Sequence, residues 1–299
     1  MNIKPWIAAF RLKTLPLALS NTIIGTSLAA ADNRLNWSIF GLTALTTVLL
    51  QILSNMANDY GDFVNGKDTA ERIGPKRMVQ SGEISAKTML LGIIIVGILC
   101  VASGVSLIIL GTEGMDISNL LIFGLLGLAA IAAAIKYTVG KNPYGYRGLG
   151  DLFVFIFFGL VGVVGTYFLQ TQDFRWEILL PASAIGFLST GVLNMNNMRD
   201  YEADKKAGKR TIVVVMGIRK AAFYHLFLVA GAALLAVIYT FINYHSIWQW
   251  FFLLSFPLFF LNLKKVFTYT DAEQLYPELP RLSMASLVFA LTFGIGLLL

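Results

Sequence analysis

Nine long apolar stretches, separated by short polar segments, run through the 299-residue chain. Each is close to the roughly 20 residues that an α-helix needs to cross the hydrocarbon core of a bilayer. The apolar runs are continuous, whereas a transmembrane β-barrel would show strict alternation with polar residues. The pattern therefore predicts membrane-spanning helices near residues 15–31, 38–58, 88–111, 117–137, 149–170, 177–197, 221–242, 246–263 and 282–299.

Composition agrees with this pattern. Hydrophobic residues make up 57% of the chain and charged residues only 13%, whereas soluble domains carry about 25% charged residues. We therefore expect an all-α integral membrane protein, with one domain over residues 1–299 and the lipid bilayer as its surroundings.

Basic residues are distributed unevenly between the two sides of the predicted membrane. Of the 23 Lys and Arg residues, only Arg34 and Arg175 fall in the first, third, fifth and seventh connections. An excess of Lys and Arg marks cytoplasmic loops, so we expect a multi-pass protein of the cell membrane with a cytoplasmic N-terminus and an external C-terminus. The net charge of +6 then reflects topology, and we expect no nucleic-acid partner.

Two of the apolar segments end in a ladder of amide and carboxylate side chains. The first ladder is spaced i, i+3, i+4, i+7 and the second i, i+4, i+8, so each shares one helix face. Both follow even-numbered helices and lie 138 residues apart, which suggests a weak internal repeat facing one central cavity. The ladders are Asn55, Asn58, Asp59 and Asp62, and then Asn196, Asp200 and Asp204.

Stacked acids at the ends of membrane helices need a compensating charge. Like charges on one face repel, and an ionised group near the bilayer centre costs about 2.5–3.5 kcal/mol. Oxygen ligands favour a hard cation such as Mg²⁺, which usually shares its coordination with substrate phosphates. The ladders therefore predict a metal site.

Basic residues on the same side would complete a site for a diphosphate. Acids for the metal and bases for the phosphate oxygens form the pattern of a site that holds or ionises a diphosphate. No Walker-type phosphate loop is present, so nucleotide hydrolysis is not indicated. The candidate bases are Arg72, Lys76, Arg77, Lys141, Lys209 and Arg210.

The fifth apolar segment combines aromatic residues with regularly spaced glycines. Gly159, Gly162 and Gly165 stand at i, i+3, i+6, a spacing that favours close helix packing. The alternative is that they leave a groove for a polyisoprenoid chain beside Phe157 and Phe158.

Together these motifs resemble the UbiA superfamily of intramembrane aromatic prenyltransferases. The resemblance spans nearly the whole chain in the expected order, with two departures: Leu12 replaces the proline usual after Arg11, and Asp151 stands where glutamate is common. It rests on the two ladders and on residues 13–16 (KTLP), 71–77 (ERIGPKR), 148–151 (GLGD), 157–159 (FFG) and 200–211 (DYEADKKAGKRT).

The resemblance implies a bundle of about nine helices around a central cavity that opens toward the cytoplasmic side and sideways to lipid. Its expected activity is transfer of a polyprenyl group from its diphosphate to 1,4-dihydroxy-2-naphthoate, with loss of CO₂, giving the demethylmenaquinol of menaquinone biosynthesis. Two Mg²⁺ ions would bridge the diphosphate. The implied metal ligands and catalytic residues are Asn58, Asp62, Asn196, Asp200 and Asp204, with Asp68 as a further ligand.

The acceptor carboxylate needs a cationic or polar partner, and Arg11, Tyr137 and Lys141 are the candidates. Two other functions stay open at this stage. One is a prenyltransferase for another aromatic acid such as 4-hydroxybenzoate, which would use the same metal chemistry. The other is an ion-coupled transporter, which would place its charges near the bilayer midplane. Prenyl chain length, oligomeric state and the choice between Mg²⁺ and Mn²⁺ stay undetermined.

Overall fold

The computed structural model describes residues 3–67 and 73–299, and within these ranges the chain forms helices and connecting turns with no strand. Nine helical stretches of the described chain are long and apolar enough to cross a membrane, which confirms the nine predicted spans. The α-helices are α1 Lys4–Phe10, α2 Leu15–Ala31, α3 Trp37–Val64, α4 Ala86–Gly111, α5 Ile117–Lys136, α6 Gly150–Val154, α7 Gly165–Thr171, α8 Leu179–Arg199, α9 Tyr201–Lys206, α10 Ile212–Met216, α11 Ile218–Ile242, α12 Phe256–Thr268 and α13 Glu278–Leu298.

Several spans combine more than one helix type. The fifth runs from α6 through the π-helical segment η3 (Phe155–Val164) into α7, and the eighth joins the 3₁₀ segment η5 (Ile247–Ser255) to α12. Helix α3 extends to Val64, further than the predicted 38–58. The first ladder therefore lies on the last turns of a helix and not in the loop that follows it.

Local sequence signals account for the helix starts. The Asn36 side chain caps α3 by accepting hydrogen bonds from the backbone N–H groups of Ser38 and Ile39, and Ser85 caps α4 in the same way. Such caps satisfy backbone donors that have no partner within the helix. Pro16 occupies the first turn of α2, where its missing N–H costs nothing.

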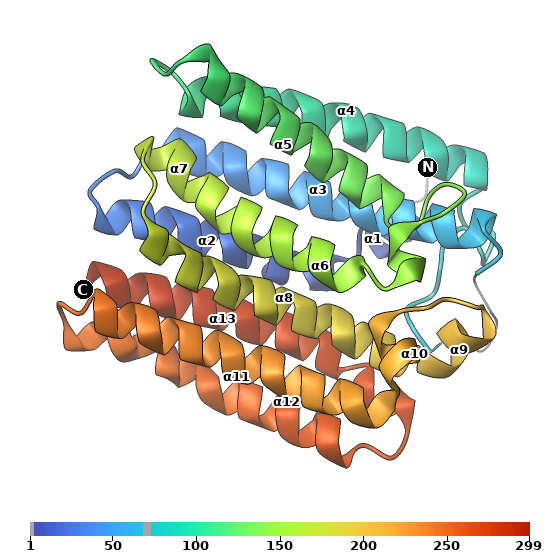
Figure 1. The fold of residues 1–299 in the computed structure, drawn as a ribbon. Helices are drawn as coiled ribbons and strands as arrows, with labels where there is room; N and C mark the ends of the chain where they lie inside the picture. Colours follow the sequence, from blue (N-terminus) through green and yellow to red (C-terminus); the bar gives the residue numbers. More distant parts are fainter. Residues whose placement is uncertain (1–2, 68–72) are drawn as a thin grey trace.

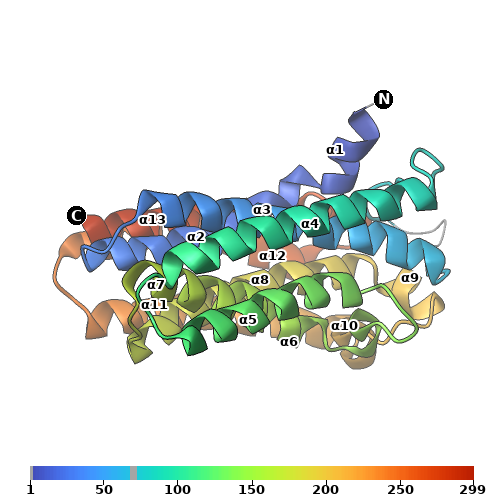
Figure 2. The same ribbon diagram turned by 90° about the horizontal axis from the view of Figure 1, so that it is seen from above.

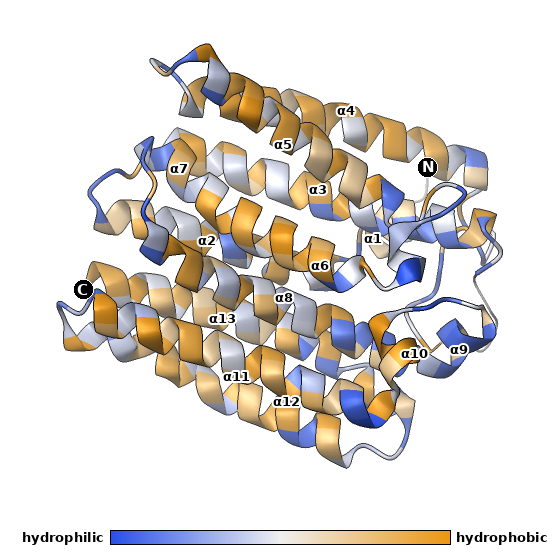
Figure 3. Ribbon diagram, in the orientation of Figure 1, coloured by the Kyte–Doolittle hydropathy of each residue, from blue (hydrophilic) through white to orange (hydrophobic). Residues whose placement is uncertain are grey.

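The long helices run roughly side by side (Figures 1 and 2), with α3, α4 and α5 on one side and α8, α11, α12 and α13 on the other. Helix α13 packs against α2, which closes the bundle between its first and last spans. Polar residues gather at the end that carries α9 and α10 (Figure 3), where α3 and α8 also end. Both ladders thus reach the same end of the bundle.

Packing is uneven around the bundle. The largest apolar core joins α2, α8, α11 and α13 around residues such as Phe252, Phe289 and Phe293. Helix α5 contributes a single fully buried residue, Ala133, and Phe123, Ile131 and Ile135 pack only partly buried against neighbouring cores. Its span has the smallest buried share of the nine spans in the described chain. Helix α5 is therefore the least firmly packed wall of the bundle.

The three glycines of the fifth span have different roles. A Cβ placed on Gly159 would lie 2.6 Å from the Gly186 Cα in α8, so the two backbones touch. A Cβ on Gly162 would meet the Asn21 side chain at 2.7 Å, whereas one on Gly165 would have its nearest neighbour, in Phe123, at 3.9 Å. Packing thus explains the first two glycines, while Gly162 and Gly165 also line a cavity.

These distances predict opposite outcomes for two alanine variants of one span. Gly159→Ala should lower the thermal unfolding midpoint in detergent by several degrees, because overpacking against a backbone costs about 1–3 kcal/mol. Gly165→Ala should leave the midpoint unchanged or raise it, because alanine is the better helix former. Equal midpoints for the two variants would contradict the close contact at Gly159.

Candidate active site

A cavity of about 360 Å³ runs from the polar end of the bundle into the space between the helices. Its polar end is formed where α3, α8 and α9 end, and its inner part is apolar. All five residues that the two ladders were expected to contribute as catalytic ligands line this one cavity: Asn58, Asp62, Asn196, Asp200 and Asp204.

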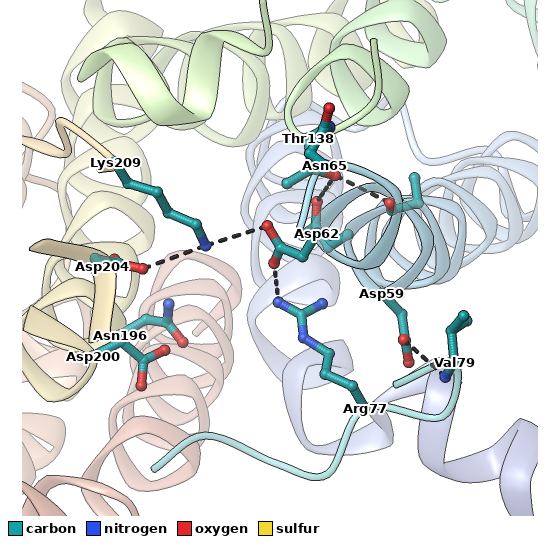
Figure 4. A network of polar contacts seen from close by, with 12 residues as sticks. Asp59, Asp62, Asn65, Arg77, Val79, Thr138, Asn196, Asp200, Asp204 and Lys209 are labelled. Carbon is teal, nitrogen blue, oxygen red and sulfur yellow. Dashed lines mark hydrogen bonds and ion pairs between the residues drawn. The ribbon is translucent and has the colours of Figure 1, made fainter. Parts of the chain in front are cut away.

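Asp62 is the most heavily paired of these residues. Its carboxylate, only 2% exposed, forms an ion pair with the guanidinium of Arg77 (Figure 4). Lys209 Nζ lies 3.2 Å from Asp62 Oδ1, and the Tyr146 hydroxyl donates a 2.6 Å hydrogen bond to the same oxygen. Three side chains from three different loops therefore converge on one buried carboxylate.

Lys209 also joins the two ladders. Its ammonium lies 3.3 Å from Asp204 Oδ1 as well as near Asp62, so it stands between the two acids (Figure 4). Burial raises the pKa of Asp204 above its usual value, and the neighbouring Asp200 adds to this rise, whereas Lys209 opposes it. A positive charge between these carboxylates is what makes their proximity tolerable in a low-dielectric site.

Asp200 and Asn196 are held by a residue of their own helix end. Arg199 donates two hydrogen bonds to the Asp200 carboxylate, at 2.8 and 2.7 Å, and a third at 2.8 Å to the Asn196 amide oxygen. A bidentate arginine fixes the orientation of a carboxylate as well as its charge. Arg199 thus positions two expected ligands at once.

The first ladder does not act as a single face. Asn55, Asn58 and Asp62 line the cavity, but Asp59 turns away and accepts hydrogen bonds from the backbone N–H groups of Met78 and Val79. The expectation that all four residues share one face is therefore wrong for Asp59. This carboxylate anchors the loop that carries Arg77.

The predicted bases divide into two groups. Arg77 and Lys209 line the cavity. Lys76 points outward and pairs with Glu83 at 2.5 Å, Lys141 is exposed in its loop, and Arg210 lies in a separate groove, so none of these three lines the cavity. Arg72 and the predicted ligand Asp68 lie outside the described residues.

Two of the three acceptor candidates line the cavity. Arg11 reaches it from the turn between α1 and α2, where the backbone has a positive φ of 51°. Tyr137 lines it from the end of α5, and burial together with the nearby Asp151 raises the pKa of its hydroxyl, which stays protonated as a hydrogen-bond donor. Lys141 is not among the lining residues.

The inner part of the cavity suits an apolar chain. Small and aromatic side chains from α4, α5 and the fifth span face one another across it. Aromatic rings stack along one wall, with Tyr144 and Phe153 centroids 4.1 Å apart and Phe153 and Phe157 at 6.1 Å. The apolar lining includes Leu107, Ile108, Phe123, Leu126, Phe157 and Phe158.

The donor set fits a hard divalent cation that also contacts a ligand. Among the described residues, no group of three or more His, Cys, Asp or Glu side chains is arranged to hold a metal ion. The cavity instead offers three carboxylates, Asp62, Asp200 and Asp204, together with the expected amide ligands Asn58 and Asn196. Magnesium commonly binds through one or two carboxylates and fills its remaining positions with water and phosphate oxygens. The residues present thus fit Mg²⁺ in company with a diphosphate.

Sequence reasoning missed the residues that orient the acids. Tyr146 and Arg199 bond directly to Asp62 and Asp200, and Thr138 donates to the Asn58 amide oxygen at 3.1 Å. Arg199 was visible beside the second ladder, since a basic residue directly before a buried acid is a natural partner. No sequence signal identified Tyr146 or Thr138.

Comparison with known proteins places these features in one family. The model of the UbiA prenyltransferase family matches residues 18–297. The 1,4-dihydroxy-2-naphthoate octaprenyltransferase of Haemophilus influenzae is 44% identical over 300 aligned positions that cover 100% of this chain and 97% of that protein. The enzyme of the same name from Escherichia coli K12 is 40% identical, with 98% and 95% covered.

Solved structures share the fold at lower identity. The apo structure of a UbiA homolog from Aeropyrum pernix K1 has a TM-score of 0.66 at 17% identity, covering 100% of this chain and 98% of that one. A UbiA homolog from Archaeoglobus fulgidus, solved with GPP and Mg²⁺, has a TM-score of 0.61 at 16% identity, with 99% and 100% covered. At these identities the similarity shows the fold alone.

Two aspartates on the same helix provide a test of the site. Asp62→Asn should lower the thermal unfolding midpoint, because Arg77 and Lys209 lose a buried partner, and breaking such a pair costs about 3–5 kcal/mol. We expect Mg²⁺ with inorganic diphosphate to raise the midpoint of the unmodified protein, and Asp62→Asn should abolish this rise.

Asp59→Asn is the matched control, because Asp59 is equally buried and outside the cavity. It should lower the midpoint through weaker loop hydrogen bonds, each contributing about 1 kcal/mol or more, and still show the full ligand-induced rise. A full rise in Asp62→Asn would show that the cavity is not the ligand site.

Proposed function

The chain belongs to the UbiA prenyltransferase family, and we propose that it transfers a polyprenyl group from polyprenyl diphosphate to 1,4-dihydroxy-2-naphthoate, releasing diphosphate and CO₂. One observation carries this proposal. A single cavity joins a polar end to an apolar compartment lined by aromatic residues. At the polar end, buried acids form ion pairs with Arg77 and Lys209. That combination suits a substrate with a diphosphate head and a hydrocarbon tail.

The acceptor is proposed from the relatives. The proteins from H. influenzae and E. coli that carry the dihydroxynaphthoate activity in their names align with this chain along almost its whole length at 40–44% identity. Neither of these two proteins is named for the alternative acceptor, 4-hydroxybenzoate.

The diphosphate would be held at the polar end through Mg²⁺, and we propose that two ions take part. Their protein ligands would be Asn58, Asp62, Asn196, Asp200 and Asp204. Bound Mg²⁺ supplies positive charge that stabilises the diphosphate as it leaves. Arg77 and Lys209, now neutralising Asp62 and Asp204, lie where they can contact diphosphate oxygens in turn. Tyr146 and Arg199 keep the carboxylates oriented through their hydrogen bonds.

The bond changes balance without an external base. The C–O bond between the prenyl carbon and the diphosphate breaks, and the allylic cation is attacked by the ring carbon that bears the carboxylate. The bond from that ring carbon to the carboxyl carbon then breaks and CO₂ leaves. The electron pair of the broken bond stays with the ring and restores its aromaticity. Because CO₂ departs from the attacked carbon in place of a proton, the site needs no general base there.

We assign acceptor binding to two residues that line the cavity, one in the turn between α1 and α2 and one at the end of α5. Arg11 would hold the carboxylate and Tyr137 would donate a hydrogen bond to the ring substituents, since both line the cavity. The cation is formed in a chamber walled by the Tyr144 and Phe153 rings. Aromatic faces attract cations electrostatically, so this wall would stabilise the intermediate and exclude water.

Product analysis tests the acceptor. We expect purified protein supplied with carboxyl-labelled 1,4-dihydroxy-2-naphthoate, a polyprenyl diphosphate and Mg²⁺ to release labelled CO₂ and diphosphate one for one. Prenylated product that keeps the label would contradict the decarboxylating step. Efficient prenylation of 4-hydroxybenzoate alone would assign the chain to the other acceptor class.

We further propose, from the uneven distribution of Lys and Arg between the two sides of the predicted membrane, that this is a multi-pass protein of the cell membrane. Its polar end would face the cytoplasm. A reporter fused after Leu299 should therefore signal from the outer face, and one fused before the first residue from the cytoplasm. A cytoplasmic signal from the C-terminal fusion would reverse the orientation of the site.

A further inference from the structure

A second depression lies at the same end of the bundle, outside the cavity. It is a groove between the turn before α6 and helix α10 with the residue Arg210 before it, and it shares no lining residue with the cavity. The lining residues are Arg147, Gly148, Arg210, Ile212, Val215 and Met216.

The groove combines two unpaired cations with apolar walls. Arg147 and Arg210 are exposed, and neither guanidinium has a hydrogen bond or ion pair within the part of the chain that the structure describes. Among the residues that the structure describes, none of those lining the groove is acidic. Val215 in α10 is 67% exposed, and Leu152 in the first turns of α6 is 52% exposed, so both elements that flank the groove present an aliphatic side chain at the surface.

The position of the groove sets it at the membrane interface. Gly148 precedes the start of α6 by two residues, and Met216 precedes the start of α11 by two residues. Both helices begin membrane spans. The groove therefore lies beside the starts of two spans, and the ends of membrane spans are the level at which lipid headgroups meet a protein.

We propose that this groove binds the phosphate of an anionic membrane phospholipid, with Arg147 and Arg210 on the phosphate and the acyl chains along Val215 and Leu152. Two guanidinium groups without an acidic neighbour complement a negatively charged headgroup, and guanidinium matches phosphate in a bidentate geometry. The apolar walls accommodate the acyl chains, which a free phosphate lacks.

The groove is the outer side of two loops whose inner side belongs to the cavity. Tyr146 and Lys209 face Asp62, and the residues directly after them, Arg147 and Arg210, face the groove. The two loops are already joined, because the Arg210 backbone N–H donates a 2.8 Å hydrogen bond to the Tyr146 carbonyl. A phosphate that bridges both arginines would join the same loops from outside.

The proposal is tested by lipid retention, which requires no catalytic activity. Protein reconstituted in nanodiscs of phosphatidylcholine with increasing phosphatidylglycerol is released and weighed by native mass spectrometry. We expect one phosphatidylglycerol to be retained by the unmodified protein. Arg147→Gln and Arg210→Gln should each weaken its retention about fivefold, the equivalent of ~1 kcal/mol per basic residue near a membrane, and the double variant more strongly.

The matched control is Arg219→Gln combined with Lys220→Gln, which removes two exposed charges from the same end of α11 outside the groove. This control should retain the lipid like the unmodified protein. Equal retention by the Arg147/Arg210 double variant, or equal loss in the control, would overturn the proposal. Displacement of the lipid by inorganic diphosphate would also overturn it, because it would make the groove a site for free phosphates. The diphosphate-induced rise in unfolding midpoint checks that each variant is folded and keeps its cavity.

Discussion

The polar end of this protein depends on the burial of three carboxylates where two membrane-spanning helices end. Buried acids are tolerated only when paired. Asp62 has Arg77 and Lys209, Asp200 has Arg199, and Asp204 shares Lys209. Because these pairs already fix the carboxylates, a diphosphate and its cations would meet groups that are oriented before binding, which reduces the entropy lost on association.

The sequence predicted the spans and the ladder positions, since both depend on periodicity along one chain. It could not predict which way each side chain turns at the edge of a face. At about 100° per residue, Asn58 and Asp62 lie on one side of Asn55, whereas Asp59 lies on the other. That offset is enough to direct Asp59 to the backbone of the loop at Met78.

Partner choice among the basic residues was beyond sequence reasoning for a related reason. Lys76 and Arg77 are neighbours in the sequence, as are Lys209 and Arg210. Only Arg77 and Lys209 line the cavity. In an extended loop, successive side chains point to opposite sides, so the direction of the backbone decides between neighbours. Charge content locates the loop, and only the fold assigns its residues.

The uneven packing of the bundle bears on how a long hydrocarbon chain is accommodated. The cavity would receive a diphosphate, two fused rings and the reactive end of the donor, and a polyprenyl chain of many units extends far beyond these groups. Helix α5 has one fully buried residue and, like Phe157 and Phe158 of the fifth span, lines the cavity. Among the helices that wall the apolar compartment, α5 would lose the least packing on being displaced. Lipid on the outer side of α5 would dissolve the remaining prenyl units, because both are hydrocarbon. The tail is therefore expected to leave past α5, so the site would fix the reactive end of the donor while placing little restriction on its length.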